Sequence, residues 1–524
     1  MHHCLEIDEI LCNIYGYIDD RRTLCNIART CRTLSEPAAD FIWETLTNLI
    51  PILLQLSCVD LVQGHVSDPM RLKFTRPLTN TDWETVRRLS SRVRKLHLSD
   101  IDHNTQGMFY LSMAQDPAYI FPNLHALSIE FGLWHNVPMT YISEMLIRPH
   151  LTALRLGRNA VNCLRLDVSR VPVSLPHLRY LNIGENDDMC TIIPQLHSLE
   201  SLIFRVRSWD NLRHLSHLPL LTHLMVRFPL GFSPLDNTTS GISFPKLIVL
   251  CIHHCTPELL ENLLHHATFH NVTSLSVTVM NRIPSEVATN RDLLTFILTQ
   301  LPHLESLRMK KYVGAFHPET WDCSAISISP YLRLLDIEAS SDLALSDEGL
   351  TQMARALPHL EHLHIVNPEG PHAHLYLTLK GITSLAWHCP QLKGFKLSFD
   401  ARLNSLPTDF LEKINHIAIQ NNNVYYMDVL NSHVRATDRP YVARLLSKVF
   451  PYLQEIHYAK PWRWAKVAAQ LDGRPARYAN SDSVERDVIE EQEGVEWRWI
   501  GEEMGAPRAI KGLLRTASTL SLYD

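Results

Sequence analysis

A short motif recurs along most of this 524-residue chain and limits the possible folds more than any other feature. The motif is Pro-x-Leu-x-x-Leu-x-apolar, and its clearest copies begin at Pro122, Pro176, Pro302 and Pro358. Weaker copies keep the central apolar residue. The central residues are Leu96, Leu127, Leu154, Leu181, Leu202, Leu224, Leu250, Leu275, Leu307, Leu335, Leu363, Phe395, Ile417 and Ile456. Repeats of roughly 20 to 50 residues are typical of solenoids, so the chain from about Val93 onward is predicted to be one.

Each copy is predicted to be a short strand, because residues of a strand alternate between its two faces and Leu-x-apolar places both apolar residues on one face. Helical spacing follows in the segments between copies, for example at 256–267, 291–300, 347–356 and 440–450. This pattern resembles that of the leucine-rich-repeat family. The resemblance implies an α/β solenoid, or horseshoe, with strands on the concave side and helices outside. Spacings from 21 residues (181 to 202) to 39 (417 to 456) predict an irregular one.

The first 46 residues are predicted to form three short amphipathic helices. The first begins near Asp8 and carries an apolar stripe that runs from Ile7 to Ile18. Thr23 is the expected N-cap of the second helix. Ser35 is the expected N-cap of the third, with Pro37 in its first turn. Three helices this short cannot bury all of their large apolar residues among themselves, so we expect part of this surface to bind a partner.

These residues resemble an F-box. The resemblance lies in the stretch from Leu5 to Leu11, in Tyr17-Ile18, in Thr30-Cys31 and in Trp43. Leu34 stands where the family often has tryptophan. The resemblance implies that the helices bind Skp1, the adaptor of cullin-based ubiquitin ligases. The expected Skp1-binding residues are Leu5, Ile7, Ile10, Leu11, Ile14, Ile18, Leu24, Ile27 and Cys31.

The chain is predicted to have four parts: an F-box at 1–48, a linker with a helix at 49–91, a repeat solenoid at 92–460 and a C-terminal cap and tail at 461–524. The linker helix opens at Thr79. The stretch from Phe74 to Leu78, with Asp82-Trp83, resembles the linker of fungal, especially basidiomycete, F-box proteins. Past Ala459 the repeat is expected to stop. The tail contains Trp462 and Trp464, which are expected to pack over the last repeat.

The net charge of −6 predicts no general attraction to nucleic acid or to anionic membranes. Eleven scattered cysteines are typical of free thiols in a reducing compartment. Acidic residues near the start, such as Glu6 and Asp8, stand where a signal peptide would be basic. We therefore expect a cytoplasmic or nuclear protein.

No catalytic constellation stands out. Cys251, His253, His254 and Cys255 are close in sequence, but alternate residues of a strand face opposite ways, which does not favour a metal site. There is no Cys-x-x-Cys pair and no Gly-x-x-x-x-Gly-Lys loop. We expect no cofactor, no metal and no catalytic residue, so the chain is not predicted to be an enzyme.

The concave face is the expected site for a target protein. Residues beside each central leucine should face the groove, and several are cationic. The candidate target-binding residues are Arg155, Arg205, Arg227, Arg308, Lys310 and His364. Such a surface would suit an acidic or phosphorylated segment. The resemblance implies a substrate-recognition subunit of an SCF-type (Skp1–cullin–F-box) ubiquitin ligase; the alternative is a repeat scaffold that binds partners without ubiquitination.

Overall fold

The computed structural model describes residues 7–18, 20–62, 71–98, 111, 119–129, 145–157, 168–184, 188–229, 231–232, 241–281, 290–313, 329–339, 345–366, 377–406, 410, 420–458, 461–471 and 476–478. They fall into two compact units, which are described separately. The first comprises the described residues up to Arg205 and the turn His217–Leu220. The second comprises Val206–Ser216 and the described residues from Leu221 onward.

Three helices open the first unit, as predicted: α1 (Asp8–Tyr15), α2 (Arg21–Ala28) and α3 (Arg32–Glu44). Their shared core consists of Leu11, Tyr15, Leu24 and Ala38, each at most 5% exposed. Tyr15 also meets the ring of Phe41 edge-on, at a centroid distance of 6.0 Å. The apolar stripe of α1 therefore supplies the interior of this small helical module.

Two predicted helix starts are wrong. Asp20 caps α2, because its carboxylate accepts hydrogen bonds from the backbone N–H groups of Arg22 (3.1 Å) and Thr23 (3.0 Å). Helix α3 begins at Arg32, so Pro37 lies inside it. The missing N–H of proline costs the helix one internal bond. Pro37 and Ala38 are both buried, and this packing holds the helix together across that position.

The sheet of the first unit begins directly after α3. Strand β1 (Thr45–Leu46) pairs in parallel with β4 (Lys95–Leu98). Three ion pairs strengthen the join: Lys95 Nζ lies 3.1 Å from a carboxylate oxygen of Glu44, and Arg92 pairs with both Glu36 and Asp40 of α3. The helical module is thus continuous with the first repeat strand.

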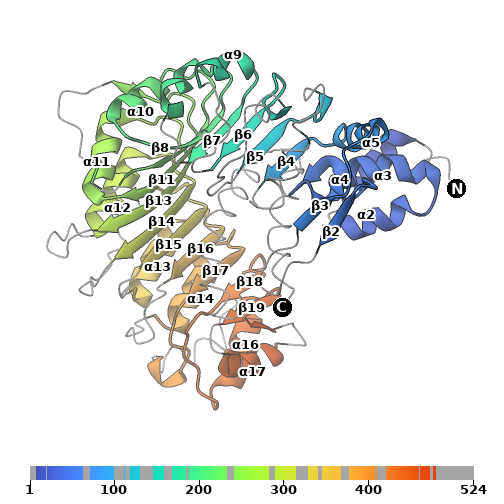
Figure 1. The fold of residues 1–524 in the computed structure, drawn as a ribbon. Helices are drawn as coiled ribbons and strands as arrows, with labels where there is room; N and C mark the ends of the chain where they lie inside the picture. The colour runs from blue at the N-terminus through green and yellow to red at the C-terminus, as the bar shows by residue number, and fades with distance from the viewer. Residues whose placement is uncertain are drawn as a thin grey trace. The chain divides into compact units, whose positions relative to one another are not determined.

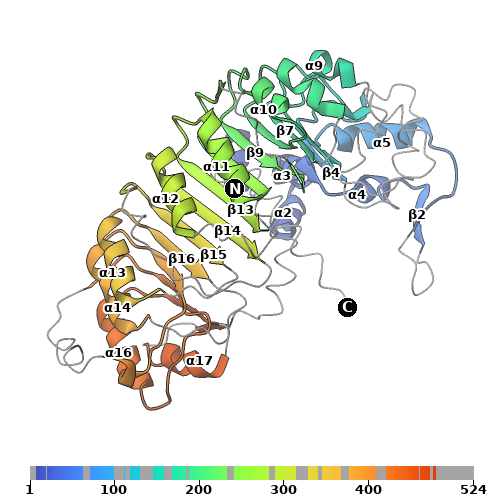
Figure 2. The same ribbon diagram turned by 90° about the vertical axis from the view of Figure 1, so that its left-hand side faces the viewer.

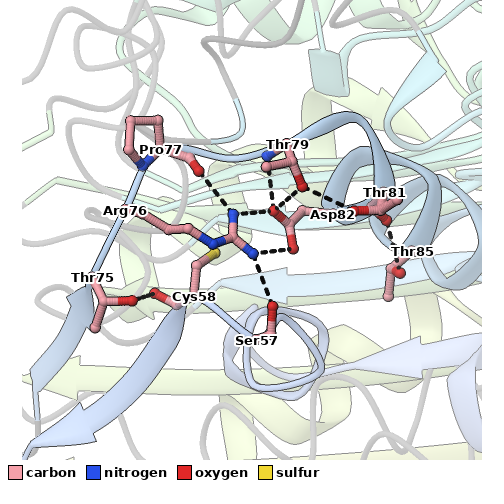
Figure 3. Close-up of polar contacts among 9 residues, drawn as sticks. All are labelled: Ser57, Cys58, Thr75, Arg76, Pro77, Thr79, Thr81, Asp82 and Thr85. Atoms are coloured by element: carbon pink, nitrogen blue, oxygen red, sulfur yellow. Dashed lines mark hydrogen bonds and ion pairs between the residues drawn. The ribbon is translucent and has the colours of Figure 1, made fainter.

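The linker folds around one charged cluster, which Figure 3 shows. The linker contains α4 (Ile50–Leu53), the antiparallel strands β2 (Val59–Val62) and β3 (Arg71–Phe74), and α5 (Asn80–Ser90). Asp82 accepts hydrogen bonds from Arg76 Nη1 (2.6 Å) and from the Thr79 backbone N–H (2.8 Å). The bond from Arg76 is the main reason that the pKa of Asp82 lies well below its usual range. Thr79 caps α5, as predicted.

The repeat strands of the first unit are all parallel. Beyond β4 they follow the order β5 (Ala126–Ile129), β6 (Ala153–Leu156), β7 (Tyr180–Gly184) and β8 (Ser201–Arg205). Their central leucines are at most 2% exposed. The described connections are short helical turns: η3 (Val168–Arg170), α9 (Val171–Ser174), η4 (Asp188–Thr191) and η5 (Ile193–Gln195).

The second unit repeats strand and helix more regularly (Figures 1 and 2). Its parallel strands are β9 (His223–Arg227), β11 (Val249–Cys255), β13 (Ser274–Asn281), β14 (Ser306–Val313), β15 (Leu334–Ala339), β16 (His362–Val366), β17 (Gly394–Leu397), β18 (Tyr426–Asp428), β19 (Glu455–Tyr458) and β20 (Ala476–Tyr478). Strands β10 (Ile242–Ser243) and β12 (Ala267–Thr268) form a separate pair.

Helices line one face of this sheet, and Figure 2 shows α11 to α16 along it. They are α10 (Trp209–Leu215), α11 (Pro257–His266), α12 (Asn290–Gln300), α13 (Asp347–Ala356), α14 (Leu379–His388), α16 (Arg439–Val449) and α17 (Pro461–Ala469). Four of them confirm the helices predicted at 256–267, 291–300, 347–356 and 440–450. The opposite face of the sheet carries no helices among the described residues and is called the concave face (Figures 1 and 2).

The prediction places one repeat at the wrong residue. Ile417 lies outside the described residues, and the strand between Phe395 and Ile456 is centred instead on Met427, which pairs with both. In this repeat, Asn421 stands where other repeats have an apolar residue before the proline, and Val424 stands where they have the first leucine of the motif. The Asn421 side chain is buried and donates a hydrogen bond to the Cys389 carbonyl (2.8 Å). The repeat also continues past Ala459, because β20 pairs with β19.

Contacts between neighbouring repeats hold the second unit together. Asp347, in the first turn of α13, accepts hydrogen bonds from the backbone N–H groups of Thr378 (2.7 Å) and Gly381 (3.0 Å), and so caps the next helix, α14. At the end of the unit, Trp464 packs edge-on against Phe399 and donates its indole N–H to the Ser432 carbonyl (2.9 Å). Trp464 therefore covers the last repeats, as expected for a cap.

Candidate interaction surfaces

The N-terminal helices leave part of α1 apolar and exposed. Ile7, Ile14 and Tyr17 are 45%, 42% and 71% exposed. Ile7 precedes α1, Ile14 lies in its last turn, and Tyr17 follows it. Large apolar side chains grouped on a short helix, in a module whose core is already filled, are typical of a protein-binding surface.

The predicted Skp1-binding residues divide into three groups. Leu11 and Leu24 are 1% and 5% exposed and stabilise the module itself. Ile10, Ile18, Ile27 and Cys31 are half-buried, and Ile18 and Ile27 pack on the core. Ile7 and Ile14 are exposed, and Leu5 lies outside the described residues. The predicted set does not include Tyr17, although Tyr17 belongs to the stretch that resembles an F-box.

The concave face of the repeats is built by strand alternation. Leu307, Leu335 and Leu363 are fully buried. Arg308, Asp336 and His364 follow them, point to the other face and are half-buried. These three pair in register across β14, β15 and β16. The sheet thus carries straight rows of polar side chains, as the repeat pattern predicts.

The predicted target-binding residues do not form one group. Arg155 in β6 and Arg205 at the end of β8 belong to the first unit. Arg227 ends β9, Arg308 and Lys310 lie in β14, and His364 lies in β16, all in the second unit. Arg308 and Lys310 share β14, and His364 lies two strands away because β15 separates β14 from β16.

Acidic residues stand beside several of these cations. Lys310 Nζ lies 3.4 Å from a carboxylate oxygen of Glu338, and Lys396 Nζ lies 3.7 Å from one of Asp428. Asp336 is the register neighbour of both Arg308 and His364. The face of β14 to β18 therefore carries both signs of charge, with opposite signs on β14 and β15 and again on β17 and β18. The acidic target predicted from the cations alone remains a prediction.

A second part of the same face, on β9 and β11, carries apolar side chains and two histidines beside the cationic Arg227. Met225, Val249 and Cys251 are at most 5% exposed although they point to the concave side. Burial lowers the pKa of His223 to about 4 and that of His253 to about 3. Sequence reasoning recorded Arg227, Cys251 and the histidines here, but it did not predict an apolar surface. The signal that it passed over was the apolar residue on either side of Leu250.

In each unit, parallel strands with buried central leucines stack side by side, and helical segments on one face of the sheet connect successive strands. The repeats form a leucine-rich-repeat solenoid. No protein-family model matches the sequence, and no curated protein matches it. Solved leucine-rich-repeat structures are similar to the chain only at low identity, so the assignment rests on the chain's own repeat geometry.

Three solved structures illustrate this similarity. A chain of the yeast Rad7–Elc1 complex is 14% identical, with 75% of this chain and 82% of that chain covered and a TM-score of 0.36. An internalin from Listeria monocytogenes is 13% identical, with coverages of 75% and 89% and a TM-score of 0.30. The leucine-rich-repeat protein LegL7 from Legionella pneumophila is 12% identical, with coverages of 69% and 96% and a TM-score of 0.28.

The described residues include histidines, cysteines and carboxylates that could in principle bind a metal ion or act as nucleophiles. Among them, no three His, Cys, Asp or Glu side chains gather to hold a metal ion. The thiol of Cys255 is buried and donates to the Thr278 carbonyl (3.6 Å), and burial raises its pKa to about 12. A thiol with so high a pKa is a poor nucleophile. Within the same residues, no helix combines the length and apolar character needed to cross a membrane.

Proposed function

We propose that this chain is the substrate-recognition subunit of an SCF-type E3 ubiquitin ligase, of the kind found in fungal F-box proteins. Its N-terminal helices would bind Skp1, and its leucine-rich repeats would bind a target protein. One observation carries the proposal. The residues that resemble an F-box fold into three packed helices, and the first of these leaves Ile7, Ile14 and Tyr17 exposed.

The chain would contribute proximity rather than chemistry. Skp1 would connect it to a cullin and to a ubiquitin-charged enzyme, while the repeats hold the target nearby. Holding two reactants together raises their effective concentration without any catalytic group on the holder. A repeat sheet suits this role because it presents many side chains on a rigid support.

A second function is a leucine-rich-repeat scaffold that binds partners without ubiquitination. The extended polar rows on β14 to β18 are compatible with it, because they bind a target in either case. Recovery of a cullin together with Skp1 separates the two functions. A scaffold would bring down its target without the cullin.

The docking surface is tested by Ile14→Asp combined with Tyr17→Asp. Both side chains are exposed, so the module should still fold, whereas a charge at the buried Leu11 would unfold it. We expect loss of at least about tenfold in Skp1 binding, since burying unpaired carboxylates in an apolar interface costs several kcal/mol. The measurement is affinity of the purified full chain for Skp1.

Val173→Asp is the matched control. Val173 is an apolar side chain of the first unit, 84% exposed, and lies in α9 among the repeats. It should bind Skp1 as the wild type does. Wild-type Skp1 affinity in the Ile14/Tyr17 double variant would refute the docking surface.

A further inference from the structure

We propose that the concave face of β14 to β18 recognises an α-helical target segment that presents acid, base, acid and base in that order. The surface, here called the charge ladder, consists of Arg308 and Lys310 on β14, Asp336 and Glu338 on β15, Lys396 on β17 and Asp428 on β18. The proposal deepens the proposed function, since it describes the target of the repeats. It does not involve the Skp1-binding helices.

The register makes the ladder a straight row. Arg308 pairs with Asp336, Asp336 with His364, His364 with Lys396, and Lys396 with Asp428. A second row beside it pairs Lys310 with Glu338. Along the sheet the charge is therefore positive on β14, negative on β15, positive on β17 and negative on β18. A uniformly acidic segment would meet repulsion at two of these four strands.

Strand β16 separates the two halves of the ladder. Burial lowers the pKa of both His362 and His364, so this strand is neutral near pH 7. The two rings meet edge-on at a centroid distance of 6.2 Å. A target would need no charge opposite β16.

The ladder's ions keep bonding capacity for a target. Lys310 and Glu338 are 3.4 Å apart, and Lys396 and Asp428 are 3.7 Å apart, which is longer than a well-formed charged hydrogen bond. The side chains of Lys310 and Glu338 are 43% and 29% exposed. Asp428 is the least accessible of these ions, because its side chain is 10% exposed and also accepts a hydrogen bond from the Leu430 backbone N–H (2.9 Å). An ammonium group has three donors and a carboxylate about four acceptor sites, so these neighbours do not exhaust either.

A helix fits this surface better than an extended segment. Strands β14 to β18 are paired on both sides, so an added strand would find no free edge. A helix satisfies its own backbone hydrogen bonds and offers only side chains. Strands about 4.8 Å apart place β15, β17 and β18 roughly 5, 14 and 19 Å from β14. With a rise of about 1.5 Å per residue, positions i+3, i+10 and i+14 lie about 4.5, 15 and 21 Å from position i, within about 2 Å of these distances, and all four share one helix face.

The test uses two alanine-based helical peptides of equal composition. The matched peptide carries Glu, Lys, Glu and Lys at those four positions, and the mismatched peptide carries Lys, Glu, Glu and Lys. The order of charges in the mismatched peptide is the same in both chain directions, so binding in the reverse orientation cannot produce a match. The full chain should bind the matched peptide about tenfold more tightly, because two ion pairs become two like-charge contacts in the other.

Variants of the chain sharpen the test. The double variant Lys310→Glu with Glu338→Lys keeps an ion pair between β14 and β15. Each of these strands then carries one positive and one negative ladder residue and has no net ladder charge, so the preference for the matched peptide should disappear. The quadruple variant, which adds Arg308→Asp and Asp336→Arg, makes β14 negative and β15 positive. The mismatched peptide should bind this variant more tightly than the matched peptide does. The control exchanges another exposed pair, Asp210→Arg with Arg213→Asp on α10, 3.4 Å apart. It should keep the wild-type preference.

Several results would overturn the proposal. They are equal affinity of the wild type for both peptides, no binding of either up to about 1 mM, or a preference unchanged by the Lys310/Glu338 exchange. Tighter binding of a peptide with four glutamates would support the uniformly acidic target instead. Skp1 affinity is measured on the same variants and should not change. Failure of the ladder is thereby distinguished from failure of the proposed function.

Discussion

Lowering the pH from 7 to 5.5 should destabilise the chain through two buried histidines. His223 in β9 and His253 in β11 are neutral in the folded protein. Burial is the main cause in both, and Arg227, His254 and Lys310 further lower the pKa of His253. The folded pKa values are about 4 and about 3. In the unfolded chain both return to about 6.5.

The sign follows from proton binding. Between the folded values and about 6.5, the unfolded chain binds more protons, so the free energy of unfolding rises with pH there and falls as the pH drops. From pH 7 to 5.5, each histidine that remains neutral in the folded state costs about 1.2 kcal/mol, and the two together cost about 2.5 kcal/mol.

The assay is urea unfolding at both pH values for the wild type and for His223→Gln with His253→Gln. The double variant should lose about 2.5 kcal/mol less than the wild type on acidification. All other titrating groups are the same in both proteins, so their contributions to the pH-dependent loss of stability cancel in the difference. His303→Gln, at an exposed turn, is the control and should behave as the wild type does. If the double variant loses as much stability as the wild type, these imidazoles are not buried neutral groups.

Three further predictions concern the stability of the repeats and the linker, each measured as the free energy of unfolding. Leu307→Ala should cost about 2–5 kcal/mol because Leu307 is fully buried, whereas Arg308→Ala on the concave face should cost less than about 1 kcal/mol; equal losses would contradict the strand register. Gly381→Ala should cost about 1–3 kcal/mol, because its Cβ would lie 2.5 Å from Leu377 Cδ1 and 2.6 Å from Asp347 Oδ1. Gly349→Ala, with 3.5 Å to its nearest neighbour, should not destabilise, and similar losses at both glycines would refute the crowding argument. Asp82→Ala should cost about 1–3 kcal/mol by leaving Arg76 and the Thr79 N–H without their carboxylate, and an unchanged stability would show that this cluster does not hold the linker.

Sequence alone determined the repeat and its elements. Burial of Leu307 and Leu363, and helix α13 at Asp347–Ala356, follow from apolar spacing within a few residues. Such spacing reports which face of a strand or helix is buried, and it needs no knowledge of distant residues. Local signals also compete, which is why Asp20 caps α2 although Thr23 was the expected N-cap.

Tertiary structure decided which residues meet. Lys310 and Glu338 are 28 positions apart in the sequence, and their contact depends on the register of β14 with β15. Met427 became a central repeat residue through pairing with Phe395 and Ile456, without the usual motif. The same holds for Leu11, whose stripe looked like a binding face until α2 and α3 covered it. Strand register and helix packing depend on contacts between residues far apart in the chain, and a local pattern carries no record of them.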